Sequence, residues 1–318
     1  MNKLYMGIDI GSISTKGVII DKYNNIITSS YLYTEGNPIR AVKKVIKNMR
    51  NDIDLNNYQV VSVGTTGSAR KLIGTLIGAN TIKNEITAHA VGTVKLYPDV
   101  RTIFEIGGQD SKITIVNNGV VCDYAMNTLC AAGTGAFISS LAKRLDVPIE
   151  SVSDVAFSSQ NKVNVAARCT VFAESDLIHK IQAGYKKEDI IAGVCRAVAI
   201  NYMNNVAKGK KIKGTVVFNG GVSKNKAVVK SFEEIVGTKI IVDKNSHLMG
   251  AFGIAVMARE SKKENIFNFD VDNLRLETKI IECDKCSNHC EIVSVYRNDK
   301  LLDYWGNHCA KGKVLENV

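Results

Sequence analysis

Short apolar runs separated by turns of small residues recur along the chain, which is the pattern of an α/β protein. Residues 5–20 (YMGIDIGSISTKGVII) contain two apolar strands joined by such a turn. Residues 103–116 (IFEIGGQDSKITIV) repeat the plan about one hundred positions later. Each segment predicts a β-hairpin whose tip offers backbone N–H groups, hydroxyls and an acidic side chain, the groups that cradle a phosphate and a hydrated Mg²⁺. Two such hairpins indicate duplicated lobes that face one nucleotide.

A third segment, residues 214–236 (GTVVFNGGVSKNKAVVKSFEEIV), predicts a buried strand, a turn at Asn219-Gly220-Gly221 and a helix. A glycine pair after a strand lets the backbone lie flat against a ligand, as recognition of adenosine requires. The chain contains neither a GxxxxGK(S/T) nor a GxGxxG motif. The sequence therefore excludes P-loop and Rossmann nucleotide sites.

Two cysteines stand just before predicted helices. Cys130 precedes residues that are apolar at helical spacing, namely Phe137, Ile138, Leu141 and Leu145. Cys169 precedes a similar set, namely Val171, Phe172, Leu177, Ile178 and Ile181. A helix N-terminus favours a thiolate through its dipole and free N–H groups. Two thiolates are too few for an iron–sulfur cluster, which usually needs four, but a two-fold dimer would present the pair twice. The pattern predicts one 4Fe–4S cluster held between two subunits.

The other six cysteines fall into two groups. Cys122 and Cys195 lie in strand-like and helix-like apolar segments and are predicted to be core residues. The remaining four form the pattern C-x2-C-x3-C-x18-C at Cys283, Cys286, Cys290 and Cys309. The strands EIVSVYR and KLLDYW, joined by a turn at Asn298-Asp299, would form a hairpin that returns the last cysteine to the first three. Four thiolates at this spacing can hold Zn²⁺ or a second iron–sulfur cluster, and His289 or His308 could replace one of them.

Composition favours a soluble globular protein. Of the 318 residues, 45% are hydrophobic and 23% are charged, and no apolar run approaches the ~20 residues of a membrane span. The net charge of +10 is spread over lysines without interleaved aromatic residues, which favours a solvated surface or a site for an acidic protein partner over a nucleic-acid site. The N-terminus lacks the pattern of a secretory signal. We therefore expect a cytoplasmic protein whose eight cysteines form no structural disulfides.

The three nucleotide-type segments, in this order, resemble the superfamily of acetate and sugar kinases, heat-shock chaperones and actin. The resemblance implies an α/β fold of two duplicated, ribonuclease-H-like lobes with ATP and Mg²⁺ in the cleft between them. The lobes would span residues 1–98 and 99–262, and the last helix of the second range would belong to the second lobe or return to the first. A polar linker would then lead to a small cysteine-rich β-hairpin module at residues 275–318.

The same resemblance assigns roles to individual residues. Asp9 and Asp110 would hold Mg²⁺ through water and act in catalysis. The phosphates would lie against two groups, one formed by Gly11, Ser12, Thr15 and Lys16 and the other by Gly107, Gly108, Gln109, Asp110 and Ser111. Gly220 and Gly221 would lie beside the adenosine. Glu85, in the segment NEITAHA, is a further polar candidate, although a glutamate on a helix surface explains it equally well.

The segments CAAGTGAF and ARCTVFAES make the resemblance more specific. Over residues 3–260 the chain is similar to the ATP-dependent activators of 2-hydroxyacyl-CoA dehydratases and to the ATPase subunits of benzoyl-CoA reductase. This family implies that Cys130 and Cys169 ligate the shared cluster. It also implies a homodimer that takes a low-potential electron from ferredoxin or flavodoxin and passes it to a dehydratase-type partner.

The cysteine module departs from the shortest activators of this kind, which leaves the partner open. Three alternatives remain. The partner could be a double-cubane-cluster reductase. The chain could be a small-molecule kinase of the same superfamily. It could also be a nucleotide-dependent adaptor with a zinc module and no redox role.

Overall fold

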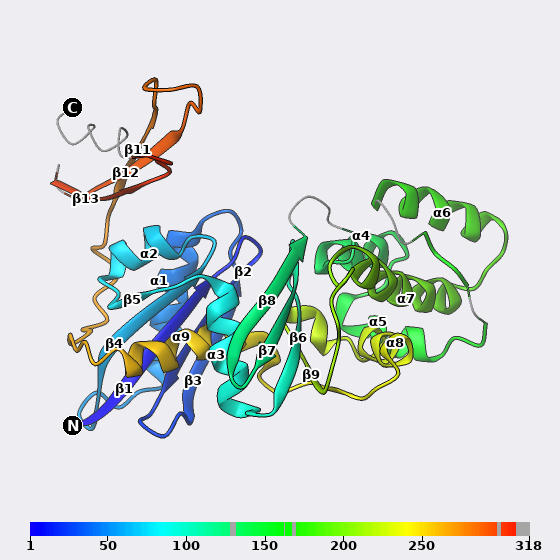
Figure 1. Cartoon of the computed structure of the whole chain (residues 1–318), viewed down its shortest axis with the longest axis horizontal. Coiled ribbons are helices and arrows are strands. Elements are labelled where there is room, and N and C mark those ends of the chain that lie inside the picture. Colours follow the sequence, from blue (N-terminus) through cyan, green and yellow to red (C-terminus); the bar gives the residue numbers. More distant parts are fainter. Residues whose placement is uncertain (128–131, 162, 167–169, 298–299, 310–318) are drawn as a thin grey trace.

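Two five-stranded sheets and a small third sheet form the framework of the protein (Figure 1). The computed structural model describes residues 1–127, 132–161, 163–166, 170–297 and 300–309. Helices lie on and between the two large sheets, and the fold is α/β, as the sequence predicts.

The first sheet has the strand order β3-β2-β1-β4-β5. Its central strand β1 is antiparallel to β2 and parallel to β4. The side chains of β1 from Met6 to Ile10 are buried because α1 covers one face of the sheet and α9 covers the other. The elements of this half are β1 (Asn2–Ile10), β2 (Ser14–Ile20), β3 (Ile26–Tyr33), α1 (Pro38–Asn51), β4 (Tyr58–Gly67), α2 (Arg70–Ile77), β5 (Thr81–Ile82) and α3 (Glu85–Leu96).

The second sheet repeats the first. Its order is β10-β9-β6-β7-β8, and its central strand β6 is antiparallel to β7 and parallel to β9. The duplication predicted from the two hairpins is therefore present in the strand order. The strands are β6 (Val100–Ile106), β7 (Ser111–Asn117), β8 (Val120–Asn127), β9 (Thr215–Asn219) and β10 (Ile240–Ile241).

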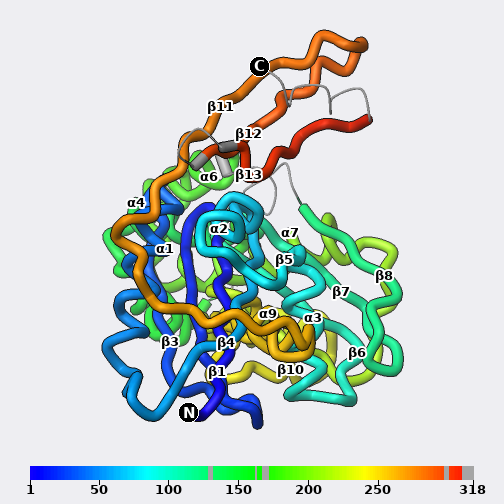
Figure 2. Tube along the Cα trace, turned by 90° about the vertical axis from the view of Figure 1, so that its left-hand side faces the viewer, coloured from blue at the N-terminus to red at the C-terminus, as the bar shows by residue number. Residues whose placement is uncertain are grey.

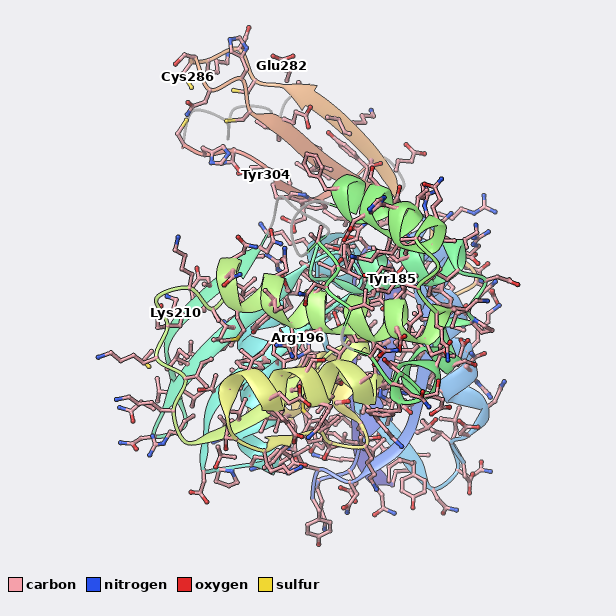
Figure 3. The ribbon with its side chains drawn as sticks, turned by 90° about the vertical axis from the view of Figure 1, so that its right-hand side faces the viewer. Tyr185, Arg196, Lys210, Glu282, Cys286 and Tyr304 are labelled. Atoms are coloured by element: carbon pink, nitrogen blue, oxygen red, sulfur yellow. The ribbon has the colours of Figure 1, made fainter. Side chains whose placement is uncertain are left out.

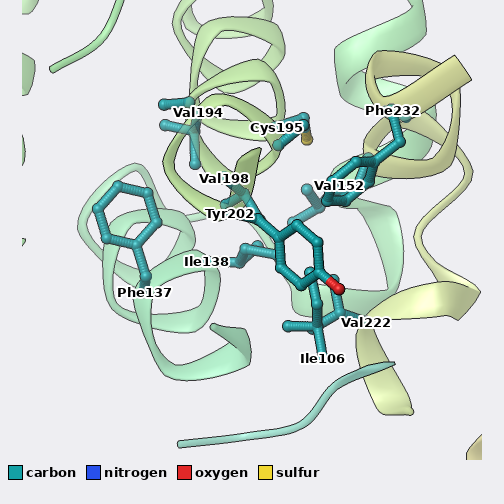
Figure 4. Close-up of a cluster of buried hydrophobic side chains, with 14 of the residues drawn as sticks. Ile106, Phe137, Ile138, Val152, Val194, Cys195, Val198, Tyr202, Val222 and Phe232 are labelled. Carbon is teal, nitrogen blue, oxygen red and sulfur yellow. The ribbon is translucent and has the colours of Figure 1, made fainter. Parts of the chain in front are cut away.

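Five helices and an aromatic cluster support the second sheet. The helices are α4 (Gly135–Arg144), α5 (Val152–Phe157), α6 (Thr170–Gln182), α7 (Lys187–Asn205) and α8 (Lys226–Val236). The ring of Phe232 lies 5.2 to 5.4 Å from the rings of Phe104, Tyr202 and Phe218. Figure 4 shows Tyr202 among apolar side chains of several elements. Its hydroxyl donates to the carbonyl of Lys112 at 2.6 Å, so this core also holds β7 in place.

The two predicted core cysteines have different outcomes. Cys195 is 1% exposed within the core of the second half, which confirms its prediction (Figure 4). Cys122 is exposed, so its prediction is wrong. It lies on β8, which is the edge strand of the second sheet, and a strand at an edge can have an apolar residue on an open face.

Helix α9 (Met249–Glu260) returns to the first sheet, where it packs on β1, β2 and β4. It also packs along α3, and the two helices approach very closely at Gly253. A Cβ atom at Gly253 would lie 1.8 Å from the carbonyl oxygen of Ala88, so only glycine fits there. Because α3 also contacts β6 and β7, this helix pair joins the two halves of the molecule.

Residues 263–276, here called the strap, follow α9 and differ from the predicted polar linker. The N–H groups of Asn265 and Phe267 donate to the carbonyls of Val61 and Val60. Phe269 and Val271 are buried in the core of the first sheet. The charged residues around them hide this apolar spacing in the sequence. Figure 2 shows the strap running along the first half of the molecule toward the C-terminal sheet.

The third sheet consists of β11 (Glu277–Glu282), β12 (Glu291–Arg297) and β13 (Lys300–Trp305), with β12 in the centre and both pairings antiparallel. The predicted Asn298-Asp299 turn lies outside the described residues. Thr75 on α2 donates to Asp303 on β13 at 3.5 Å, a contact between this sheet and the first half. None of the helices described here has the length and apolar character that crossing a membrane requires.

Candidate nucleotide site between the two sheets

A cavity of about 1070 Å³ lies between the tips of the two predicted hairpins. Its wall also includes the N-terminal turn of α3 and two short 3₁₀ helices, η2 (Gly221–Lys224) and η3 (Ser246–Leu248). Every residue that the sequence assigned to nucleotide or Mg²⁺ lines this cavity, with the exception of Thr15 and Ser111. Glu85 lines it as well.

Thr15 and Ser111 lie behind the cavity wall. Side chains alternate across a strand, so Ser14 and Lys16 face the cavity while Thr15 faces away from it. The Thr15 hydroxyl lies 2.9 Å from that of Thr34, which donates to the carbonyl of Gly11. Ser111 lies in the same way between two lining residues and is 1% exposed. Neither side chain therefore lines the cavity, and the Thr15–Thr34 pair braces the first hairpin.

A buried ion pair lies at the first hairpin. Lys16 Nζ is 3.1 Å from Asp9 Oδ2, and the two residues are direct cross-strand partners. Burial acts to raise the pKa of Asp9, but Lys16 and His89 outweigh it and hold that pKa below its usual value. Burial acts to lower the pKa of Lys16, but the charge of Asp9 and its hydrogen bond outweigh this effect, so the pKa is raised. Both groups are therefore charged at neutral pH.

The second hairpin repeats this pair at Glu105 and Lys112. The segment DIGSISTK at residues 9–16 aligns with EIGGQDSK at residues 105–112, each position being 96 residues later. Lys112 Nζ lies 3.2 Å from Glu105 Oε1, again between direct cross-strand partners, and 2.6 Å from Asp110 Oδ2. The counterpart of Asp9 is thus Glu105, and Asp110 corresponds to Ser14. Sequence reasoning missed Glu105, although aligning the two segments reveals it.

Helix α3 brings two further side chains to the cavity, Glu85 and His89, which are one turn apart on one face. His89 Nε2 lies 3.5 Å from Glu105 Oε1. A Cβ atom at Gly250 would lie 2.8 Å from this same nitrogen and 2.9 Å from Asp9 Oδ2, so His89 stands between the acids of the two hairpins. Sequence reasoning missed His89, because a single histidine in an apolar helix gives no signal of a site.

Glu85 is a cavity residue and not an ordinary glutamate on a helix surface. Its side chain is 23% exposed, and Arg70 lies 3.7 Å away. Its Oε2 atom finds no hydrogen-bond partner within the described part of the chain. A buried carboxylate oxygen with free acceptor capacity is suited to a water molecule or ligand in the cavity.

The Gly220-Gly221 turn has the close approach that the sequence predicts. Gly220 has a φ of +90°, and a Cβ atom there would lie 2.3 Å from the carbonyl oxygen of Ile106. Nearby, the rings of Tyr31 and His247 pack at a tilt of 51° with their centroids 5.8 Å apart. Burial, followed by the charges of Lys224 and Lys16, lowers the pKa of His247 to about 4. A neutral imidazole and a phenol ring thus line this end of the cavity.

Helix α4 is bonded directly to the second hairpin tip. The N–H of Gly135 donates to the carbonyl of Gly107 at 2.9 Å, and the N–H of Ala136 donates to that of Gly108 at 2.8 Å. Glu174 on α6 then accepts from Ser140 Oγ at 2.9 Å and pairs with Arg144 at 2.7 Å, both on α4. Cys130 and Cys169 lie outside the described residues. The helices that follow them in the sequence are these two, α4 and α6.

The residues in this cavity fit a magnesium nucleotide. Three carboxylates converge with two buried lysines, and Mg²⁺ prefers carboxylate and water oxygens while lysine binds phosphate as a point charge. A Cβ atom at Gly108 would lie 2.6 Å from the Ile13 side chain across the cleft, so the missing side chain leaves room where the two tips meet. Asp9, Glu105 and Asp110 would hold the ion.

Comparison with known proteins agrees with this fit. Residues 6–258 match the BadF/BadG/BcrA/BcrD ATPase family. The chain belongs to this family. The resemblance predicted from the cysteine and phosphate segments is therefore confirmed. The matched range ends before the strap and the C-terminal sheet.

Two activator proteins are close relatives. The chain is 34% identical to the 2-hydroxyisocaproyl-CoA dehydratase activator of Clostridioides difficile, over 82% of this chain and 96% of that protein. It is 33% identical to the (R)-2-hydroxyglutaryl-CoA dehydratase activating ATPase of Acidaminococcus fermentans, over 80% and 96% of the two chains. A solved structure of the activator of the 2-hydroxyisocaproyl-CoA dehydratase from Clostridium difficile with bound ADPNP superposes with a TM-score of 0.75, at 32% identity over 81% of this chain and 95% of that one.

Proposed function

We propose that this ATPase is a reductive activator of a 2-hydroxyacyl-CoA dehydratase-type enzyme. It would take an electron from ferredoxin or flavodoxin and deliver it through a 4Fe–4S cluster that two copies of the chain share at Cys130 and Cys169. The activating roles in the names of its relatives support this proposal. The relation of α4 and α6 to the nucleotide cavity supports it independently.

The observation that carries the proposal is the pair of hydrogen bonds from Gly135 and Ala136 to the Gly107-Gly108 tip. A phosphate bound at this tip would contact the same turn whose carbonyls receive the first N–H groups of α4. Glu174 links α4 to α6, so a movement of α4 would act on α6 as well. ATP binding and loss would therefore act on the two helices that follow the proposed cluster ligands.

This coupling would help to drive an electron transfer that is unfavourable in free energy. Each ~59 mV of uphill one-electron transfer disfavours the product tenfold, or about 1.4 kcal/mol. Movement of the lobes around ATP, a hinge motion, would change the exposure of the cluster and its fit to the partner. ATP would thus act as a gate on electron transfer.

The chain's own residues account for the hydrolytic step. Lys16 and Lys112 would hold the phosphate oxygens, because their pKa values are raised and both stay protonated. Glu105 and His89, 3.5 Å apart, would orient the attacking water, and Glu85 would accept a hydrogen bond from it. Mg²⁺, when bound, would neutralise the charge that develops on the phosphates.

An exposed apolar strip on α6 supports the dimer. Ile178, Ile181 and the following Tyr185 are each close to half-exposed. Phe172 is 66% exposed. These positions fit the predicted helix, but among the α6 side chains from Phe172 onward only Ala173 and Leu177 are buried within one chain. A second copy seated on α6 would bury the strip and bring two pairs of cysteines together.

The test is anaerobic analysis of iron, sulfide and dimer mass in the wild type and in a Cys130→Ala/Cys169→Ala variant, with Cys122→Ala as the matched control. We expect a loss of about four irons per dimer in the double variant alone. Iron that persists unchanged in the double variant would contradict the proposal.

A protein with no iron in either form would leave the kinase and zinc-adaptor alternatives. If the iron is lost from the double variant as expected, assays of ATP-dependent reduction of a dehydratase and of a double-cubane-cluster reductase would distinguish the two possible clients.

A further inference from the structure

Two cysteines are neighbours at one end of the C-terminal sheet, and two more lie in the segments that lead from this end. In the β11–β12 ladder Glu282 pairs with Glu291, so Cys283 and Cys290 stand side by side just beyond the last pair. The N–H of Cys283 donates to the carbonyl of Cys290 at 2.8 Å. Both side chains are buried, at 6% and 7% exposure. The loop between them contains Cys286, whose carbonyl accepts from the N–H of His289.

The main chain after β13 leads toward the fourth cysteine, Cys309, from this same end of the sheet. Val293 pairs with Trp305 in the β12–β13 ladder, so β13 ends opposite the start of β12. The next residue, Gly306, has a φ of +102°, and a Cβ atom there would lie 2.1 Å from the carbonyl oxygen of Glu291. Only glycine permits this approach. The chain that leads to Cys309 therefore starts against the residue next to Cys290. Figure 3 shows Cys286 at the outer end of the sheet, beyond Glu282.

This sheet has too small an apolar core to explain its fold. Its described cluster consists of Cys283, Cys290 and Ile292 with Tyr304 packed against them. Most of β11 is exposed, including Ile280 at 67%. Modules of about 40 residues generally need a metal, disulfides or a partner for stability. Two of the four cysteines are thus among the few buried side chains of this sheet, and they are too small to form a stabilising apolar core.

We propose that Cys283, Cys286, Cys290 and Cys309 hold one thiolate-bound metal centre that cross-links the three strands. The chemistry is that of soft thiolate ligands, which select Zn²⁺ or the iron of an iron–sulfur cluster. Binding would displace the four thiol protons and involve no other covalent change. In the described part of the chain no three Cys, His, Asp or Glu side chains surround a common point. Forming the centre therefore requires the four thiols to move closer together.

The experiment uses the full chain in a Cys130→Ala/Cys169→Ala background, so that the proposed bridging cluster cannot contribute. After anaerobic purification we expect one zinc, or about four irons with equal sulfide, per chain. Adding Cys283→Ser/Cys290→Ser should reduce this content at least tenfold, whereas adding Cys122→Ser, at an exposed cysteine on β8, should leave it unchanged. Zinc without sulfide identifies a structural site, and iron with sulfide identifies a cluster.

Two further measurements cover a variant that fails to fold. Cys286→Ser alters a residue in the loop and should weaken metal binding while nucleotide binding by the large sheets persists. In the unsubstituted module, the four thiols should react with a thiol reagent only after a chelator has removed the metal. Absence of metal, metal retained after Cys283→Ser/Cys290→Ser, or a mass that shows disulfides among the four cysteines would each overturn the proposal. None of these outcomes bears on the bridging cluster.

Discussion

Lys112 Nζ lies 3.2 Å from Glu105 Oε1, its direct neighbour across the β6–β7 ladder, and the lysine side chain is 2% exposed. Burial acts to lower the pKa of Lys112, but Glu105 and Asp110 outweigh it, so the pKa is raised. The same relation joins Lys16 to Asp9 in the first hairpin. Each hairpin therefore carries a fixed positive charge at its tip, and the two charges face one cavity.

Replacing Lys112 with methionine should damage both activity and stability. The change leaves Glu105 buried without its cation, which typically costs about 3 kcal/mol of unfolding free energy. Loss of a preorganised charge at the phosphates should lower the ATPase rate by on the order of 100-fold. Urea denaturation and steady-state ATPase assays measure the two effects. Lys210→Met is the control, because Lys210 pairs with the exposed Asp123 and should cost less than about 1 kcal/mol. Equal effects of the two substitutions would contradict this account.

Ser111→Ala should leave the KM for ATP within about twofold of the wild type. The hydroxyl is buried behind the cavity wall and has no partner among the described residues, so its removal leaves no new unsatisfied group. Lys16→Met, at a lining residue, should raise the KM clearly under the same conditions. A large increase in the KM for ATP in Ser111→Ala would instead support a direct contact between Ser111 and the phosphates, as the sequence alone suggests.

Gly250→Ala should impair hydrolysis by displacing two polar side chains at once. The added methyl would lie within 3 Å of both His89 Nε2 and Asp9 Oδ2, at 2.8 and 2.9 Å. We expect a fall in kcat of on the order of tenfold. Gly237→Ala is a suitable control, because Gly237 ends α8 in open space with φ +73°. It should cost about 1 kcal/mol of stability and leave kcat unchanged. If Gly250→Ala keeps full activity as Gly237→Ala does, hydrolysis does not depend on the positions of His89 and Asp9.

His247 should make the stability of the protein depend on acid pH. Its pKa is about 4 in the folded chain and 6.5 ordinarily. Between these values the unfolded chain binds more protons at this residue, so its contribution makes the unfolding free energy fall as pH drops from 6.5 to 4. His247→Gln should reduce that fall by about 1 kcal/mol, a value discounted because the side chain is partly exposed. Urea denaturation of both proteins at about pH 7 and about pH 4.5 tests this. An equal fall in unfolding free energy between the two pH values for the wild type and for His247→Gln would contradict it.

The sequence predicted the parts of the site that repeat and missed those that depend on tertiary packing. Two similar hairpins and a Gly-Gly turn are local patterns, so their strands and most of their lining residues were predictable. Two acids belong to the second hairpin tip, Glu105 before the 107–111 turn and Asp110 within it, and only alignment with the first hairpin shows which one matches Asp9. Cys122 was misjudged because a sequence does not reveal which strand lies at an edge. His89 gains its role only where α3 meets both hairpins.

The strap determines which half of the molecule carries the C-terminal sheet. Its main chain is bonded to β4 and its apolar side chains enter the core of the first half, whereas α4 and α6 belong to the second half. Any rotation between the halves would therefore change the position of the C-terminal sheet relative to α4 and α6. A partner protein that binds the sheet and these helices together would therefore respond to the nucleotide state without contacting the cavity.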